Sequence, residues 1–125
     1  MNFLNLMSDE FIELATKEIN QELSNMDDIL NLCKNDDDVI LKASNFQRHT
    51  HKIKGLAPMM GQDELGEIAS QLDFILKQVI DGKNISFFND LVDCIAVMKN
   101  VMNSTEYDLT KIKERILAIS ANLRS

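Results

Sequence analysis

The sequence is poor in the residues that form tight turns, stack as aromatic rings or cross-link the chain. Its 125 residues include 4 glycines, 1 proline, 2 cysteines and no tryptophan. An all-β sandwich or barrel needs turn residues about every 8–12 positions, so this scarcity disfavours such folds. Cys33 and Cys94 lie far apart and form no C-x-x-C motif. We interpret them as small buried hydrophobic residues in a reducing compartment.

Positive charge and long apolar runs are also lacking. There are 13 Lys and Arg against 20 Asp and Glu, which gives a formal net charge of −7. This balance disfavours a nucleic acid or an anionic membrane as the main partner, because each is bound by a clustered basic face. No apolar run approaches the roughly 18 residues that span a bilayer. The first residues, Met1–Met7, lack the basic start of a signal peptide, so we expect a cytoplasmic protein.

The sequence does contain enough apolar residues, 45%, to fill the core of one domain. These residues recur at spacings of three and four, which predicts amphipathic helices throughout. The expected inward positions are Ile12, Ala15, Ile19, Leu23, Met26, Leu30 and Cys33; Val39, Ala43, Phe46, Ile53, Ala57 and Met60; Leu65, Ile68, Ala69, Leu72, Leu76 and Val79; Phe88, Leu91, Ile95, Met98 and Met102; and Ile112, Ile116, Ile119 and Leu123. We interpret most of the seven methionines as core residues.

Start and stop signals divide this pattern into five helices. Ser8, the segment 35–38, Ser86 and Thr110 are predicted to begin helices, and Gly61 and Gly82 are predicted to end them. Short connections favour antiparallel neighbours. We therefore predict an all-α fold, a single domain over residues 1–125. Its core, about residues 8–102, is an antiparallel up-and-down four-helix bundle, and an additional C-terminal helix covers about residues 110–124.

The unusual residues gather between positions 49 and 66, where both histidines, the proline and three of the glycines lie. A glycine inside a helix costs about 1 kcal/mol relative to alanine, so the cluster invites a functional explanation. On an ideal helical wheel, His51 points roughly 130° away from the apolar stripe and is expected to be exposed. Lys54 and Gly55 lie one turn further on, Gln47 lies one turn before, and His49 falls nearer the core.

An exposed imidazole beside a cation suits phosphoryl transfer. A free imidazole has a pKa near 6.5 and is mostly an uncharged nucleophile at neutral pH. Lys54 can offset the charge of a phosphoryl group, and Gly55 leaves room for a partner. No nucleotide-binding motif is present, so the chain cannot take a phosphoryl group from ATP by itself. Whether to count it as an enzyme stays open. Three alternatives also remain: an exposed histidine on a non-catalytic helical adaptor, a His49–His51 metal pair, and a Cys–His couple.

The segment from His51 to Gly55, followed by Gly61, resembles the H-x-[IL]-K-G…G signature of histidine-containing phosphotransfer (HPt) domains. An acidic first helix, a Phe shortly before the histidine, the L-A-P-M-M-G continuation and a third helix with Leu72-Asp73-Phe74-Ile75-Leu76 are most similar to the phosphoacceptor domain of CheA-type chemotaxis kinases. The resemblance covers roughly residues 8–102. Asp73 stands where those domains carry a Glu that bonds the imidazole, and Ser70 replaces a second histidine.

The resemblance implies a cytoplasmic phosphorelay protein, which we expect to be a monomer with no cofactor of its own. His51 would accept a phosphoryl group from a histidine kinase catalytic domain or a phosphorylated receiver. It would then pass the group to the aspartate of a response-regulator receiver domain, which brings the Mg²⁺. Lys54 and Asp73 would assist His51. The chain is either a stand-alone HPt protein or part of a larger kinase. The expected docking residues are Gly55, Gln47, Leu56 and Pro58.

Overall fold

The computed structural model describes the backbone of residues 3–104 and 107–124, and the side chains from residue 9 onward within those ranges. The described residues form helices and connecting segments, and no strand is found among them. This confirms the all-α prediction. In chain order the helices are α1 (Phe3–Leu30), α2 (Asp36–Met59), α3 (Asp63–Ile80), α4 (Phe88–Asn103) and α5 (Thr110–Arg124).

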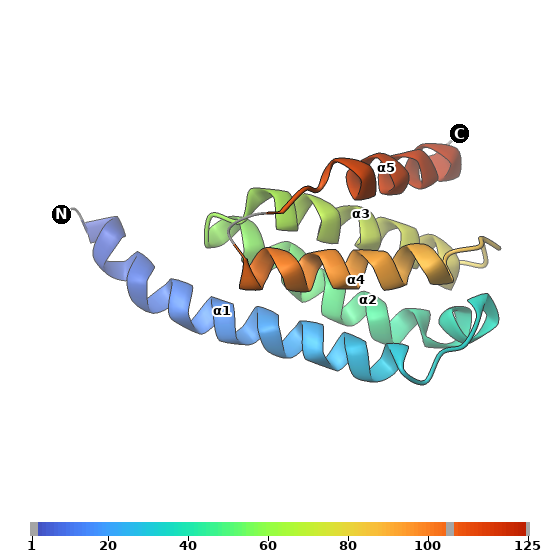
Figure 1. The fold of residues 1–125 in the computed structure, drawn as a ribbon, viewed down its shortest axis with the longest axis horizontal. Coiled ribbons are helices and arrows are strands. Elements are labelled where there is room, and N and C mark those ends of the chain that lie inside the picture. Colours follow the sequence, from blue (N-terminus) through green and yellow to red (C-terminus); the bar gives the residue numbers. More distant parts are fainter. Residues whose placement is uncertain (1–2, 105–106, 125) are drawn as a thin grey trace.

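The helices α1 to α4 form the predicted up-and-down bundle. Helix α1 packs against α2 and α4, and α3 packs against the same two helices, so that each helix has two antiparallel neighbours (Figure 1). Helix α5 lies outside this bundle against α3 and α4, as the additional C-terminal helix. No helix in the described part of the chain combines the length and the apolar character that crossing a membrane requires.

The signals that bound α2 and α3 act as predicted. The Asn35 side chain accepts a hydrogen bond from the Asp38 N–H at 3.0 Å and caps the start of α2. Gly61 and Gly82 follow α2 and α3 with φ of +84° and +104°. Both positions need the left-handed conformation that glycine adopts without steric cost. The sequence therefore places correctly the start of α2, which carries both histidines, and the ends of α2 and α3.

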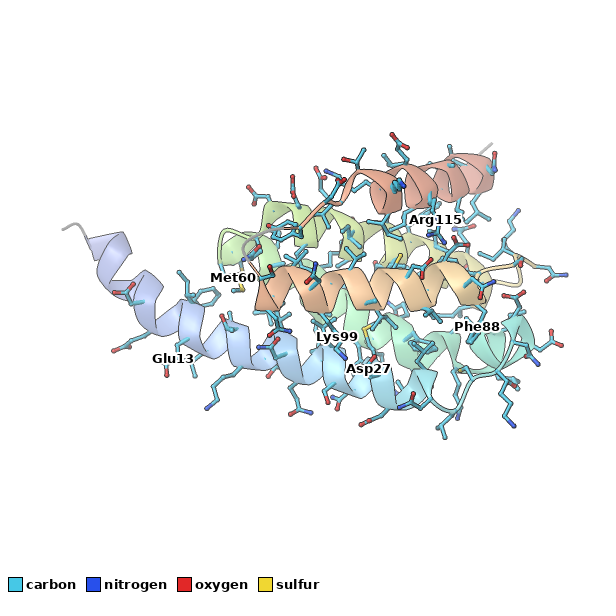
Figure 2. All side chains as sticks on the ribbon, in the orientation of Figure 1. Glu13, Asp27, Met60, Phe88, Lys99 and Arg115 are labelled. Atoms are coloured by element: carbon cyan, nitrogen blue, oxygen red, sulfur yellow. The ribbon has the colours of Figure 1, made fainter. Side chains whose placement is uncertain are left out.

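The prediction for α1 is partly wrong. The helix begins at Phe3, so Ser8 lies inside it and is not its N-cap. Ile12 is exposed rather than inward, and Cys33 is buried in the connection after the helix rather than within it. The N-terminal part of α1, which carries Glu13, projects beyond the other helices (Figures 1 and 2). An apolar stripe there has no neighbouring helix to pack against.

The start of α4 also differs from the prediction. The helix begins at Phe88, and Phe87 rather than Phe88 is fully buried. The Asp36 carboxylate, at the first residue of α2, caps α4 from across the bundle. Its Oδ1 accepts the N–H groups of Phe87 at 2.8 Å and Phe88 at 2.6 Å, and its Oδ2 accepts the Ser86 hydroxyl at 2.9 Å. Ser86 thus contacts the capping carboxylate instead of capping the helix itself.

The remaining predicted core positions are mostly buried. Leu30, Met60, Met102, Ile119 and Leu123 are only partly buried against the core. Met26 and Met98 are core residues as expected, whereas Met59 is 69% exposed. The side chains of Met1 and Met7 lie outside the described residues. Ion pairs tie the outer faces together, including one between Lys99 of α4 and Asp27 of α1, whose side chains point toward one another (Figure 2).

Candidate functional site

The two histidines of α2 lie in different environments, as the helical wheel predicts. Ile53 and Thr50 on the inward face are fully buried and fix the rotation of the helix. His51 is turned outward, and its side chain is 61% exposed. His49 is largely buried, and its Nδ1 pairs with the carboxylate of Glu22 on α1. His51 is therefore the more accessible of the two imidazoles.

Asp73 of α3 faces His51 from beneath. Its side chain is only 2% exposed, and its Oδ1 lies 3.4 Å from His51 Nδ1. This separation slightly exceeds the roughly 2.7–3.2 Å of a well-formed N–H···O bond. The Gln47 side chain, a predicted docking residue, donates through Nε2 to the same Oδ1 at 2.7 Å. The structure thus brings Gln47, His51 and Asp73 together.

Two lysines hold the other oxygen of this carboxylate. Lys54 Nζ lies 3.3 Å and Lys77 Nζ 3.1 Å from Asp73 Oδ2. Burial by itself raises the pKa of Asp73, but the hydrogen bond from Gln47 and the contacts with Lys77 and Lys54 outweigh burial and lower the pKa below its ordinary value. Asp73 is therefore a buried carboxylate that stays ionised at neutral pH.

The Asp73 carboxylate lies on the Nδ1 side of the imidazole. An anionic oxygen near Nδ1 favours the tautomer that carries its proton on Nδ1, and we assign the proton there on this ground. Nε2, across the ring from Asp73, then keeps its lone pair on a side chain that is mostly exposed. The site therefore offers an oriented nitrogen nucleophile, with the Lys54 ammonium one helical turn away.

The surface around His51 is partly what the sequence predicts. Gly55 is exposed, and a Cβ built on it would meet no atom within 4 Å. Pro58 is exposed near the end of α2, and its ring lies over Gly66 of α3. Leu56 is less exposed than the helical wheel predicts, because it is partly buried against the core. The helical wheel assumed a single buried stripe on α2. The helix instead packs against both α1 and α3, so more of its surface is covered.

Two participants in these networks are missed by the sequence analysis. Lys77 follows Asp73 by one helical turn, a spacing at which a lysine reaches a carboxylate, so a signal for it existed. Glu22 gives no such signal, because it reaches His49 across the bundle. Its side chain is 3% exposed, and its Oε1 also lies 3.4 Å from Lys52 Nζ. Burial raises the pKa of Glu22, but His49, Glu18 and Lys52 together lower it below its ordinary value.

Other chemistry finds little support in these side chains. The imidazoles of His49 and His51 turn to different carboxylates on different helices. Within residues 9–104 and 107–124, no group of three histidine, cysteine or acidic side chains is placed to hold a metal ion. Burial raises the pKa of the Cys94 thiol to about 12, which suppresses its reactive thiolate at neutral pH.

Comparison of the chain with models of protein families, with curated proteins and with solved structures finds no match.

Proposed function

We propose that the chain is a histidine phosphotransfer domain whose phosphoacceptor is Nε2 of His51. The observation that carries this proposal is the exposed imidazole whose Nδ1 faces a buried, lysine-paired carboxylate. The proposed donor is the catalytic domain of a histidine kinase or a phosphorylated receiver. The proposed acceptor is the aspartate of a response-regulator receiver domain, which supplies the Mg²⁺.

The chemistry follows from the orientation of the ring. The Nε2 lone pair attacks phosphorus and forms the N–P bond, while the bond from phosphorus to the leaving oxygen breaks. That oxygen keeps the bonding electrons and departs on ADP or on the donor aspartate. The imidazole becomes cationic while Nδ1 keeps its proton, and the nearby Asp73 carboxylate offsets the new charge. Transfer to the receiver reverses this sequence, with the receiver aspartate as the nucleophile.

The buried carboxylate argues against a simple adaptor, the competing function. Burying an ionised carboxylate costs several kcal/mol unless cations and hydrogen bonds compensate for it. A surface histidine on an adaptor needs no such support. Here one buried carboxylate collects Gln47, His51, Lys54 and Lys77 from two helices. This concentration of polar contacts beneath one exposed imidazole favours a reactive role for His51.

The bare surface at Gly55 supports a docking role for this face. No contact within the protein requires a glycine there, since a Cβ would meet nothing within 4 Å. A glycine kept inside a helix at a cost in stability leaves space for another molecule. Gly55, Pro58 and the exposed Met59 lie four, seven and eight residues after His51 on the same helix. We propose that the receiver docks on these residues.

The acceptor chemistry can be tested without knowing the cognate kinase. Phosphoramidate, a small donor, transfers its phosphoryl group to imidazole and releases ammonia. Incubated with the full chain, it is expected to leave one acid-labile, base-stable phosphoryl group. The His51→Gln variant should stay folded and remain unlabelled, whereas His49→Gln should be labelled like the wild type. Full labelling of folded His51→Gln would contradict the proposal, and an unlabelled wild type would favour the adaptor.

Profiling against kinases and receivers of the same cell then tests the partners. The labelled chain should pass its phosphoryl group to one receiver much faster than to the others, and the aspartate of that receiver should become phosphorylated. If the phosphoryl group is instead lost to water at the same rate whichever receiver is present, the relay role is refuted, even if His51 is the labelled residue.

A further inference from the structure

The Asp73 carboxylate has one more cation than its charge requires. Both Lys54 and Lys77 place Nζ within 3.3 Å of the same oxygen, Oδ2. The two lysine side chains are also similarly exposed, at 41% and 49%. One ammonium suffices to compensate one carboxylate, and the second must be brought close to a like charge. A pair of cations on one buried oxygen therefore needs an explanation.

The two lysines reach Asp73 from different directions. Lys77 lies on α3 itself, one turn after Asp73, so the pair forms within one helix. Lys54 lies on α2, one turn after His51, and reaches Asp73 across the helix interface. Because α2 and α3 run antiparallel, Lys77 lies toward the start of α2, whereas Lys54 lies toward its end. Lys54 therefore shares a helix with His51, whereas Lys77 does not.

We propose that Lys77 is a positioning residue, the permanent counter-ion of Asp73, which frees Lys54 to leave this carboxylate and bind the phosphoryl group on His51. This inference rests on the proposed phosphotransfer function and extends it. In the resting protein both lysines contact Asp73. When His51 carries a phosphoryl group, Lys54 turns to the phosphoryl oxygens, and Lys77 stays with Asp73.

The electrostatics of the buried site favour this division of roles. A phosphoryl group brings a charge of about −1.5 to −2, which attracts Lys54 more strongly than a single carboxylate does. If Lys54 were the sole cation on Asp73, its departure would leave a buried carboxylate without a counter-ion, which is strongly destabilising. Lys77 removes this penalty, since Asp73 keeps one ammonium and the Gln47 hydrogen bond throughout.

The resting protein provides a first test that does not depend on phosphotransfer. Thermal unfolding of the full chain is compared for Lys54→Met, Lys77→Met and the double variant. Each single variant keeps one cation on Asp73 and should lower Tm by less than about 5 °C. The double variant leaves the carboxylate without a lysine and should lower Tm by more than about 10 °C. The control is Lys99→Met, which removes a similarly exposed lysine, 46%, from its pair with Asp27 (Figure 2). A double loss equal to the sum of the single losses would overturn the shared-counter-ion argument.

The labelling rate with phosphoramidate tests the second step. Lys54→Met should slow labelling about fivefold, because the attraction between two opposite unit charges about 4 Å apart in water changes a rate by about that factor. Lys77→Met should slow it comparably, because Lys54 is then retained by Asp73. Lys77→Arg should restore the rate, and Lys99→Met should match the wild type. Wild-type labelling in Lys77→Met would overturn the proposal while leaving His51 as the acceptor.

The double variant, assayed below its melting temperature, separates this mechanism from direct contact. If Lys77 acts by releasing Lys54, removing both lysines should slow labelling no more than removing Lys54 alone. Multiplied losses, about 25-fold in total, would mean that Lys77 contacts the phosphoryl group itself, and would also overturn the proposal. If the double variant does not fold, the Lys77→Met and Lys77→Arg rates decide. An unlabelled wild type would overturn the proposed function, and the release of Lys54 with it. The Tm comparison would still show whether the two lysines substitute for each other.

Discussion

Two glycines in adjacent helices should respond in opposite directions to the same substitution. Gly55 lies in the interior of α2, where an added Cβ would meet no atom within 4 Å. Gly66 lies in α3, where a Cβ would stand 2.8 Å from Cγ and 3.0 Å from Cδ of Pro58. Neither glycine has a positive φ, so backbone conformation does not require either of them. The two positions differ in whether an added Cβ would contact another side chain.

The expected magnitudes follow from these distances. Gly55→Ala should raise the free energy of unfolding by about 0.5–1 kcal/mol, the helix preference of alanine over glycine. Gly66→Ala gains the same preference but forces a methyl group against a rigid proline ring. Overpacking of this kind costs about 1–3 kcal/mol, so the net result should be a loss of up to about 2 kcal/mol. The pair should therefore differ in sign.

Urea unfolding followed by helical circular dichroism measures both changes, and similar m-values would show that the unfolded states are comparable. The double variant Gly66→Ala with Pro58→Ala serves as a control, because it removes the ring and should recover the lost stability. A Gly55→Ala protein less stable than the wild type would mean that Gly55 serves packing. It would also refute the argument that this position is kept bare for a partner.

Three further predictions concern the cap of α4, the Asp73 carboxylate and the docking surface. Asp36→Ala should lower the free energy of unfolding by about 1–2 kcal/mol, since the N–H groups of Phe87 and Phe88 lose their acceptor. The exposed Asp37→Ala should lower it by less than about 0.5 kcal/mol in the same urea titration. The N–H groups of Phe88 and Phe87 hold the pKa of Asp36 below its ordinary value. The stability that Asp36 contributes should therefore be complete above about pH 4 and vanish as the pH falls through that lowered pKa. An equal loss of unfolding free energy in Asp36→Ala at neutral and at strongly acidic pH would contradict this. Asp73→Asn should slow phosphorylation by the kinase more than transfer to the receiver in rapid-quench assays, and equal slowing would refute an orienting role in the first step. Receiver association should change little between about 0.05 and 0.5 M NaCl in titration calorimetry, and a steep decline would indicate charge steering instead of apolar docking.

The sequence alone predicts much of the α2–α3 pair, because the determinants are local. The apolar spacing in α2 fixes which side of that helix is buried, and this rotation turns His51 outward and His49 inward. Asn35, Gly61 and Gly82 bound the helices through their own side-chain and backbone chemistry. Such features depend on neighbours within one or two turns, and a helical wheel represents those neighbours correctly.

Only the tertiary structure decides which residues from different helices meet. The sequence indicates that Asp73 could face His51 and that Lys77 could reach it within α3. The packing of α2 on α3 makes Gln47 a further partner of that carboxylate and brings Lys54 to the oxygen that Lys77 contacts. The packing of α1 on α2 likewise buries Glu22 beside His49, and the extension of α1 beyond the bundle leaves Ile12 exposed. A periodic pattern specifies the face that a helix buries. It does not specify the axial position at which two helices pack, and in this protein that position determines the charge environment of the exposed histidine.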